Sequence, residues 1–196
     1  MNPQQKTPPT FVFVHGFLDD AAVWRPLIAA LHTPDSQSRA VDLARHERVP
    51  EAGPYTLGRY ANDVIDLIDG LSGPVVLVGH SIGTLIAELA AVERPDRVVA
   101  LALLTPMPLA GAHLPEAAVA PFKSVGGSAA AQRALRLQAS PHIPEQELAR
   151  ISERAHRSRP TRFPGSLICG TSGYRKDKNR QPFPGPYWSS AAGRIR

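Results

Sequence analysis

The sequence predicts an α/β fold in which a mostly parallel central sheet is covered by helices on both faces. Two observations predict it. Short apolar runs rich in β-branched residues alternate along the chain with segments whose apolar residues recur at helical spacing, which is typical of parallel sheets. In addition, a Gly-x-Ser-x-Gly pentapeptide at residues 79–83 lies where one such run meets the helical segment that follows it.

Five segments have the length and composition of strands. They are residues 11–14, about 38–42, 75–78, 98–104 and 166–169. The length of 196 residues is enough for one ordinary domain, and 43% apolar residues can supply its core. The five segments therefore predict the strands of a single sheet.

Three helices are expected between the first four strands. Residues 21–31 form the first, and residues 57–68 form the second because their apolar side chains recur at helical spacing. The third, residues 82–94, ends before Pro95 and is apolar nearly all round, which predicts a helix packed inside the fold. Beyond Pro106 the pattern breaks into short helical pieces punctuated by proline, including residues 129–138 and 145–157.

The pentapeptide Gly79-His80-Ser81-Ile82-Gly83 carries the candidate chemistry. A side chain on so sharp a turn between strand and helix needs glycine on both sides, because a Cβ there would collide with the neighbouring backbone. The turn exposes the Ser81 hydroxyl above the sheet, where it is predicted to be a nucleophile. The alternative is a glycine-rich turn with no chemistry.

A second motif agrees with the first. The apolar run that begins at Phe11 leads directly into His15-Gly16-Phe17, and these residues together with the pentapeptide resemble the α/β-hydrolase superfamily, in its serine-nucleophile branch. The resemblance covers about residues 10–170. It implies an α/β-hydrolase fold, incomplete at its C-terminal end, with a helical cap inserted at about residues 107–160. It does not specify the substrate, because the fold serves many reactions.

The resemblance also implies roles for the residues around Ser81. The main-chain N–H groups of Phe17 and Ile82 would form the oxyanion hole, and His15 and His80 would pack beneath the site rather than accept the serine proton. The cap would supply a substrate pocket, although its apolar residues could equally be ordinary core contacts of surface helices. These residues are Met107, Leu109, Leu114, Phe122, Leu135 and Leu137.

The usual partners of the serine are missing from their expected places. Members of the superfamily carry an acid after a late strand and a histidine near the C-terminus. Here the late strand is followed by Gly170-Thr171-Ser172-Gly173, and no histidine follows His156. His113, His142 and His156 in the cap region remain candidates for the base, whereas His32 and His46 look like surface residues.

Residues 171–196 differ from the rest of the chain. Residues 1–170 hold 16 basic and 16 acidic residues, whereas the last 26 hold six basic residues against Asp177 alone. We expect a basic, proline-rich, disordered tail, and the loss of periodicity favours a chain that is truncated or frame-shifted after Gly170 over a member of the superfamily that lacks a triad. The charges are too few and too irregular to predict a nucleic-acid site.

Other classes of function are disfavoured. No stretch has the apolar length of a signal peptide or a membrane span, so a cytoplasmic protein is expected. The single cysteine, Cys169, excludes an internal disulfide framework. No histidines have metal-ligand spacing, and neither a metal nor another cofactor is expected.

The sequence thus predicts a hydrolase that transfers an acyl group from a small ester, lactone or thioester to water through Ser81. The alternative is a catalytically silent α/β-hydrolase-like binding protein, or a truncated product without the triad histidine and acid. The only partner expected is a small-molecule substrate, with no nucleic acid and no membrane.

Overall fold

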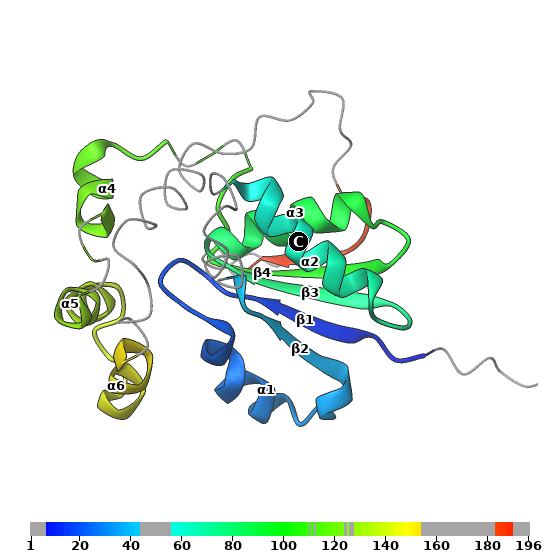
Figure 1. Cartoon of the computed structure of the whole chain (residues 1–196), viewed down its shortest axis with the longest axis horizontal. Helices are drawn as coiled ribbons and strands as arrows, with labels where there is room; N and C mark the ends of the chain where they lie inside the picture. Colours follow the sequence, from blue (N-terminus) through cyan, green and yellow to red (C-terminus); the bar gives the residue numbers. More distant parts are fainter. Residues whose placement is uncertain are drawn as a thin grey trace, which may run out of the picture.

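The computed structural model describes residues 7–43, 56–109, 111, 113–123, 125, 128–153 and 183–189. Its centre is a five-stranded parallel sheet in the order β2-β1-β3-β4-β5 (Figure 1). The strands are β1 (Thr10–Val14), β2 (Ser38–Val41), β3 (Val75–His80), β4 (Val98–Leu104) and β5 (Tyr187–Ser189). The first four confirm the strands predicted within these ranges.

Helices cover both faces of the sheet, as predicted. α2 (Leu57–Asp69) and α3 (Ile82–Glu93) lie on one face, and the 3-10 turn η1 (Ala21–Trp24) with α1 (Arg25–Leu31) lies on the other (Figure 1). The core under α2 and α3 includes Leu77, Leu85 and Ile86, all fully buried. A smaller cluster of Phe13, Trp24 and Val78 fills the opposite face, where the Phe13 and Trp24 ring centroids are 5.3 Å apart.

The apolar character of α3 has the predicted consequence. Nine of its twelve residues are buried, because the helix packs against both the sheet and the neighbouring helix α2. The amphipathic helix α2 instead buries one stripe of side chains and begins at Thr56, whose hydroxyl accepts a hydrogen bond from the Arg59 N–H.

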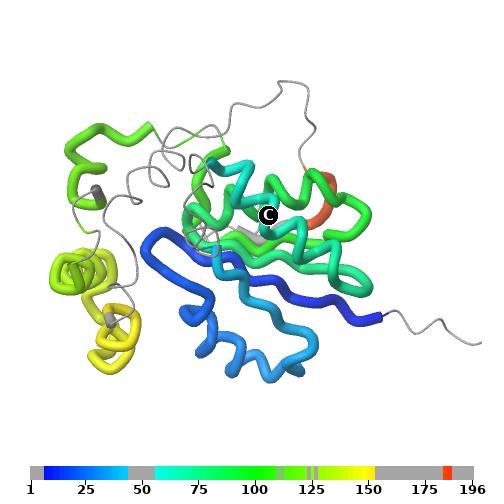
Figure 2. Tube along the Cα trace, viewed as in Figure 1, coloured from blue at the N-terminus to red at the C-terminus, as the bar shows by residue number. Residues whose placement is uncertain are grey.

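Three helices follow β4 in the part of the chain where a cap is expected. They are α4 (Glu116–Lys123), α5 (Ala129–Ala139) and α6 (Glu145–Glu153). A short 3-10 turn, η2 (Asp35–Gln37), lies directly before β2. The three helices lie beyond the carboxyl ends of the strands, next to the loop that follows β1 (Figures 1 and 2). The predicted helices 129–138 and 145–157 correspond to α5 and α6, although residues 154–157 lie outside the described ranges.

The strand β5 differs from the expectation for the last segment. The sequence predicts a tail without strands, whereas residues 187–189 pair in parallel with β4, and the Leu101 N–H donates to the Pro186 carbonyl at 3.0 Å. The open main-chain groups of β4 offer a partner to any extended segment, and Tyr and Trp favour strands. The expectation of a tail is therefore wrong for residues 187–189. The predicted strand 166–169, the Gly170–Gly173 turn and Cys169 lie outside the described residues.

The carboxyl group of Glu88 on α3 leads to a pH-dependent stability. Burial raises the pKa of Glu88 to about 7, above its ordinary value of 4.5, so the folded protein holds a proton that the unfolded chain releases. The free energy of unfolding is therefore expected to fall between pH 4.5 and 7. Because the side chain is partly exposed, the loss should be on the order of 1–2 kcal/mol.

Urea denaturation of the wild type and Glu88→Gln at pH 4.5 and pH 8 measures this effect. The variant should match the wild type at pH 4.5 and exceed it at pH 8, because the amide carries no charge at either pH. An equal difference between the two proteins at both pH values would contradict the assignment.

Candidate active site

The predicted site residues meet at the carboxyl ends of the two central strands. β1 and β3 are neighbours in the sheet, and the chain leaves them in opposite directions, β1 toward β2 and β3 toward β4. A crevice forms at such a point in parallel sheets, because the two following segments lie on opposite faces. His15-Gly16-Phe17 follows β1, and Ser81 follows β3, so the fold brings the two sequence motifs together.

Ser81 occupies a backbone conformation that few residues with side chains adopt. Its φ is 54° and its ψ is −122°, between the last residue of β3 and the first residue of α3. The Ser81 N–H donates to the Leu104 carbonyl at 3.0 Å, which ties the turn to β4. Such a conformation costs of order 1–3 kcal/mol and persists only where the surroundings enforce it.

The two glycines of the pentapeptide are required by close main-chain packing. A Cβ on Gly79 would lie 2.6 Å from the Gly83 carbonyl oxygen. A Cβ on Gly83 would lie 2.4 Å from the Val14 carbonyl oxygen and 2.6 Å from that of His15. All three distances are shorter than real contacts, so the glycines allow the start of α3 to approach the end of β1, as the sequence predicts.

Thr84 links the turn at Ser81 to the loop after β4. Its fully buried hydroxyl donates to the Ser81 carbonyl at 2.7 Å and accepts from the Met107 N–H at 3.2 Å. The Met107 sulfur in turn lies 3.9 Å from Ser81 Oγ, at the distance of a weak hydrogen bond to sulfur. Among the described residues, Met107 is the hydrogen-bond contact of the Ser81 hydroxyl. The sequence places Met107 in the pocket but gives Thr84 no role.

The predicted oxyanion donors belong to Ile82, directly after Ser81, and to Phe17, in the loop after β1. Ile82 is buried and is the first residue of α3, so its main-chain N–H has no acceptor within the helix. The positive end of the helix dipole also lies there, which favours negative charge. Phe17 is partly buried, and its ring centroid is 6.1 Å from that of Phe122 on α4. Helix α4, in the region predicted to be a cap, thus contacts residues 16–20, the predicted oxyanion turn, through this aromatic pair.

His15 is fixed by two hydrogen bonds. Its Nε2 accepts from the Leu43 N–H at 3.1 Å, and its Nδ1 lies 2.9 Å from the Gly16 carbonyl, to which it must donate. Both ring nitrogens of this buried residue are therefore engaged by the main chain. This arrangement agrees with a supporting role beneath the site.

His80 is half-buried and lies against the oxyanion turn. Its Nδ1 is 3.9 Å from Asp19 Oδ2, and its ring meets Trp24 edge-on with centroids 6.5 Å apart. Burial lowers the pKa of the His80 imidazole below its usual range, although the Asp19 carboxylate opposes that shift. The ring is accordingly neutral at neutral pH. No described histidine forms a hydrogen bond to Ser81 Oγ.

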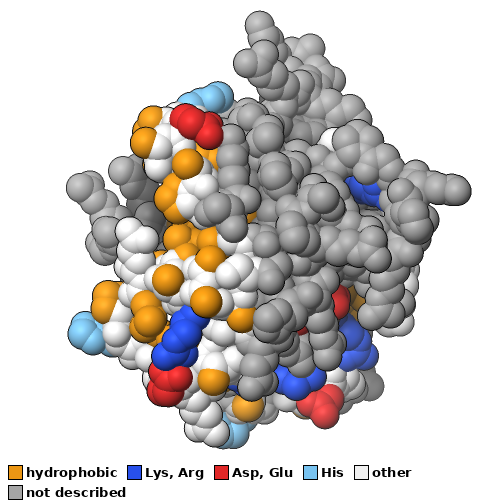
Figure 3. Space-filling view, turned by 60° about the vertical axis from the view of Figure 1, so that its left-hand side comes forward, with side chains coloured by type: hydrophobic (Ala, Val, Ile, Leu, Met, Phe, Trp, Pro, Cys, Tyr) orange, Lys and Arg blue, Asp and Glu red, His pale blue; other side chains and the backbone are white. Residues whose placement is uncertain are grey.

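The other histidines in the described ranges lie at the surface. His32, His113 and His142 are exposed, whereas His46 and His156 fall outside those ranges. Of the apolar cap residues, Met107 and Leu109 pack against the core, but Leu114 and Leu137 are exposed. Figure 3 turns the side of the molecule that carries α4, α5 and α6 toward the viewer, and apolar side chains form a band on this face.

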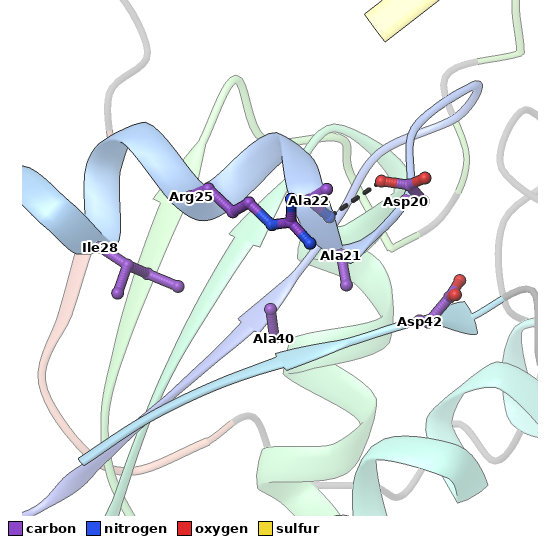
Figure 4. Close-up of a pocket in the computed structure, with 7 residues that line it drawn as sticks. All are labelled: Asp20, Ala21, Ala22, Arg25, Ile28, Ala40 and Asp42. Atoms are coloured by element: carbon purple, nitrogen blue, oxygen red, sulfur yellow. Dashed lines mark hydrogen bonds between the residues drawn. The ribbon is translucent and has the colours of Figure 1, made fainter. Parts of the chain in front are cut away.

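A cavity of about 310 Å³ lies beside the predicted site rather than in it. It opens between η1, α1 and β2, and Figure 4 shows the Asp20, Arg25 and Asp42 side chains around a floor of small apolar residues. Asp42 Oδ1 lies 4.0 Å from His15 Nε2, so the cavity adjoins the residues beneath the oxyanion turn. Ser81 does not line it.

Within the described ranges, no group of three or more His, Cys, Asp or Glu side chains is arranged to hold a metal ion. No described helix combines the length and the apolarity needed to cross a bilayer.

Known proteins share both the sequence pattern and the architecture. The pattern of the alpha/beta hydrolase family matches residues 11–192. Lipase LipV of Mycobacterium tuberculosis is 39% identical over 100 residues, which are 50% of this chain and 38% of the lipase. Probable esterase PIR7A of Oryza sativa subsp. indica is 36% identical over 111 residues, which are 53% of this chain and 41% of the esterase. These matches thus span about two fifths of the length of either relative.

A solved structure gives the same architecture. Est816, described as an N-acyl homoserine lactone degrading enzyme, superposes with a TM-score of 0.59 at 26% identity. The superposition covers 83% of this chain and 63% of Est816.

Proposed function

Because the chain belongs to the alpha/beta hydrolase family, we propose that it hydrolyses a small ester, lactone or thioester with Ser81 as the nucleophile. The observation that carries the proposal is the strained conformation of Ser81 at the junction of β3 and α3. Strain of this kind clusters at active sites, and here it accompanies a hydroxyl at the crevice above two central strands. The lipase, the esterase and the lactone-degrading enzyme that resemble the chain support the same class of reaction.

In the proposed reaction Ser81 Oγ attacks the substrate carbonyl, and the serine proton passes through a general base to the leaving group. The negative charge that develops on the carbonyl oxygen is stabilised by the Phe17 and Ile82 N–H groups, each worth about 3–4 kcal/mol. The leaving group departs, and water then releases the acyl group from Ser81. Met107 and Phe122 lie near these residues and would give the acyl group an apolar surface.

A second candidate is a binding protein that keeps the fold without turnover. It is favoured by one observation, that no described histidine forms a hydrogen bond to Ser81 Oγ. A fluorophosphonate probe separates the two candidates, because it bonds only to a serine that is activated as a nucleophile, with loss of fluoride.

The expected result is one probe adduct per chain, which mass spectrometry locates on the peptide that contains Ser81. Heat-denatured protein should not react, and neither should Ser81→Ala. Ser81-dependent turnover of p-nitrophenyl acetate should accompany the labelling. Folded wild type that is inert to both reagents would favour the binding protein, and labelling that persists unchanged in Ser81→Ala would contradict the assignment of the nucleophile.

A further inference from the structure

An arginine on α5 forms hydrogen bonds to the oxyanion turn, although more than a hundred residues separate the two in the sequence. Arg136 on α5 donates through Nη1 to Asp19 Oδ1 at 2.8 Å and through Nη2 to the Leu18 carbonyl at 2.6 Å. Arg150 on α6 makes a second contact to the same region, donating to the Ala22 carbonyl at 3.1 Å. The cap helices therefore bind the main chain that follows Phe17.

The contact of Arg136 is shielded from water. The Asp19 side chain is 5% exposed and the Arg136 side chain 14%. A guanidinium is planar, so its two N–H groups fix the positions of both acceptors relative to one another. Loss of the arginine would leave a buried carboxylate without this partner, which is costly.

The turn that Arg136 holds is itself strained. Leu18 has a φ of 69°, a region that side-chain residues rarely adopt, and its carbonyl is the one that Arg136 binds. The turn is anchored before Leu18 by β1 and after it by Asp20, whose carboxylate caps η1. If Leu18 relaxed to a negative φ, the peptide between Phe17 and Leu18 would rotate. Because both ends of the turn are anchored, the Gly16–Phe17 peptide, which carries the Phe17 N–H, would have to turn with it.

The same carboxylate also faces the other half of the site. While Asp19 Oδ1 binds Arg136, Asp19 Oδ2 lies 3.9 Å from Nδ1 of His80, the residue before Ser81. Asp19 thus lies between Arg136, with which it forms a hydrogen bond, and His80, which it approaches at a longer distance.

We infer that Arg136 is a positioning residue, which holds Leu18 and Asp19 so that the Phe17 N–H points at the oxyanion and thereby makes the oxyanion hole depend on the docked cap. The catalytic part of this inference rests on the proposed function. Its structural part, the ordering of residues 16–20 by Arg136, does not.

The test compares Arg136→Met with Arg133→Met. Arg133 is a matched control because it lies on the same helix, one turn earlier, and pairs with Glu145 at an exposed position. With p-nitrophenyl acetate, Arg136→Met should lower kcat by about 10- to 100-fold, the effect of a small misplacement at a reacting centre, and leave KM within about threefold. Arg136→Lys, which keeps the charge opposite Asp19, should recover part of kcat, and Arg133→Met should match the wild type.

Amide hydrogen exchange of the peptide covering residues 16–20 provides a readout that needs no activity. Exchange there should be faster in Arg136→Met than in the wild type and in Arg133→Met, while β3 and α3 exchange as in the wild type. Unchanged exchange in a folded Arg136→Met protein would overturn the inference, as would a rise in KM at constant kcat. If the wild type lacks Ser81-dependent turnover, the proposed function fails, and hydrogen exchange still decides the structural part.

Discussion

Replacing Ser81 by glycine is expected to abolish hydrolysis and at the same time to stabilise the protein. The hydroxyl is the proposed nucleophile, so kcat/KM should fall at least about a thousandfold. Glycine adopts a φ of 54° and a ψ of −122° without strain, which should recover about 1–3 kcal/mol. The greater freedom of glycine in the unfolded chain offsets about 0.5–1 kcal/mol of that gain.

Ser81→Ala is the matched control for this prediction. Alanine also lacks the hydroxyl but keeps a Cβ, so it should lose activity without gaining stability. Denaturation in urea measures both variants against the wild type. A Ser81→Gly protein no more stable than Ser81→Ala would show that the turn at Ser81 stores no strain.

Gly83→Ala is expected to destabilise the fold by more than about 4 kcal/mol, which exceeds the effect of most single substitutions. The new methyl group would lie 2.4 Å from the Val14 carbonyl oxygen. That oxygen belongs to the end of β1, so it can retreat only if α3 separates from the sheet. Gly70→Ala is the control, because the nearest atoms to its Cβ lie at 3.6 Å and Gly70 has right-handed helical angles.

Thermal or urea unfolding of both glycine variants measures the difference. Gly70→Ala should be neutral or stabilising by up to about 1 kcal/mol. If Gly83→Ala were as stable as Gly70→Ala, the close approach of α3 to β1 would be refuted, and with it the geometry proposed for the oxyanion hole.

The sequence predicted the half of the fold that local patterns determine. β1, β3 and β4 are short apolar runs, and α2 and α3 have helical periodicity, so burial of their apolar side chains dictates both their type and their position. The pentapeptide around Ser81 was recognisable because its two glycines and its serine have a fixed spacing in the sequence, although the carbonyl that requires Gly83 belongs to the distant residue Val14.

The remaining features depend on contacts between distant segments. Nothing near Arg136 in the sequence marks it as the partner of Asp19, since an arginine on a polar helix usually faces water. The sulfur of Met107 reaches Ser81 only because Thr84 holds the loop after β4. Similarly, β5 forms because β4 offers main-chain partners, whereas its own residues carry no alternating pattern.

The contact between Arg136 and the Leu18 carbonyl also sets an order of assembly, because it closes a loop of 118 residues. A ribosome adds about 5–20 residues per second, so several seconds pass between the emergence of β4 from the ribosome and the emergence of α5. During that interval β1, β3 and β4 can pair, since their apolar residues are already present. The turn at Ser81 can therefore form on the growing chain before Arg136 has emerged. The predicted oxyanion turn, which Arg136 contacts, acquires its final geometry later than the turn at Ser81.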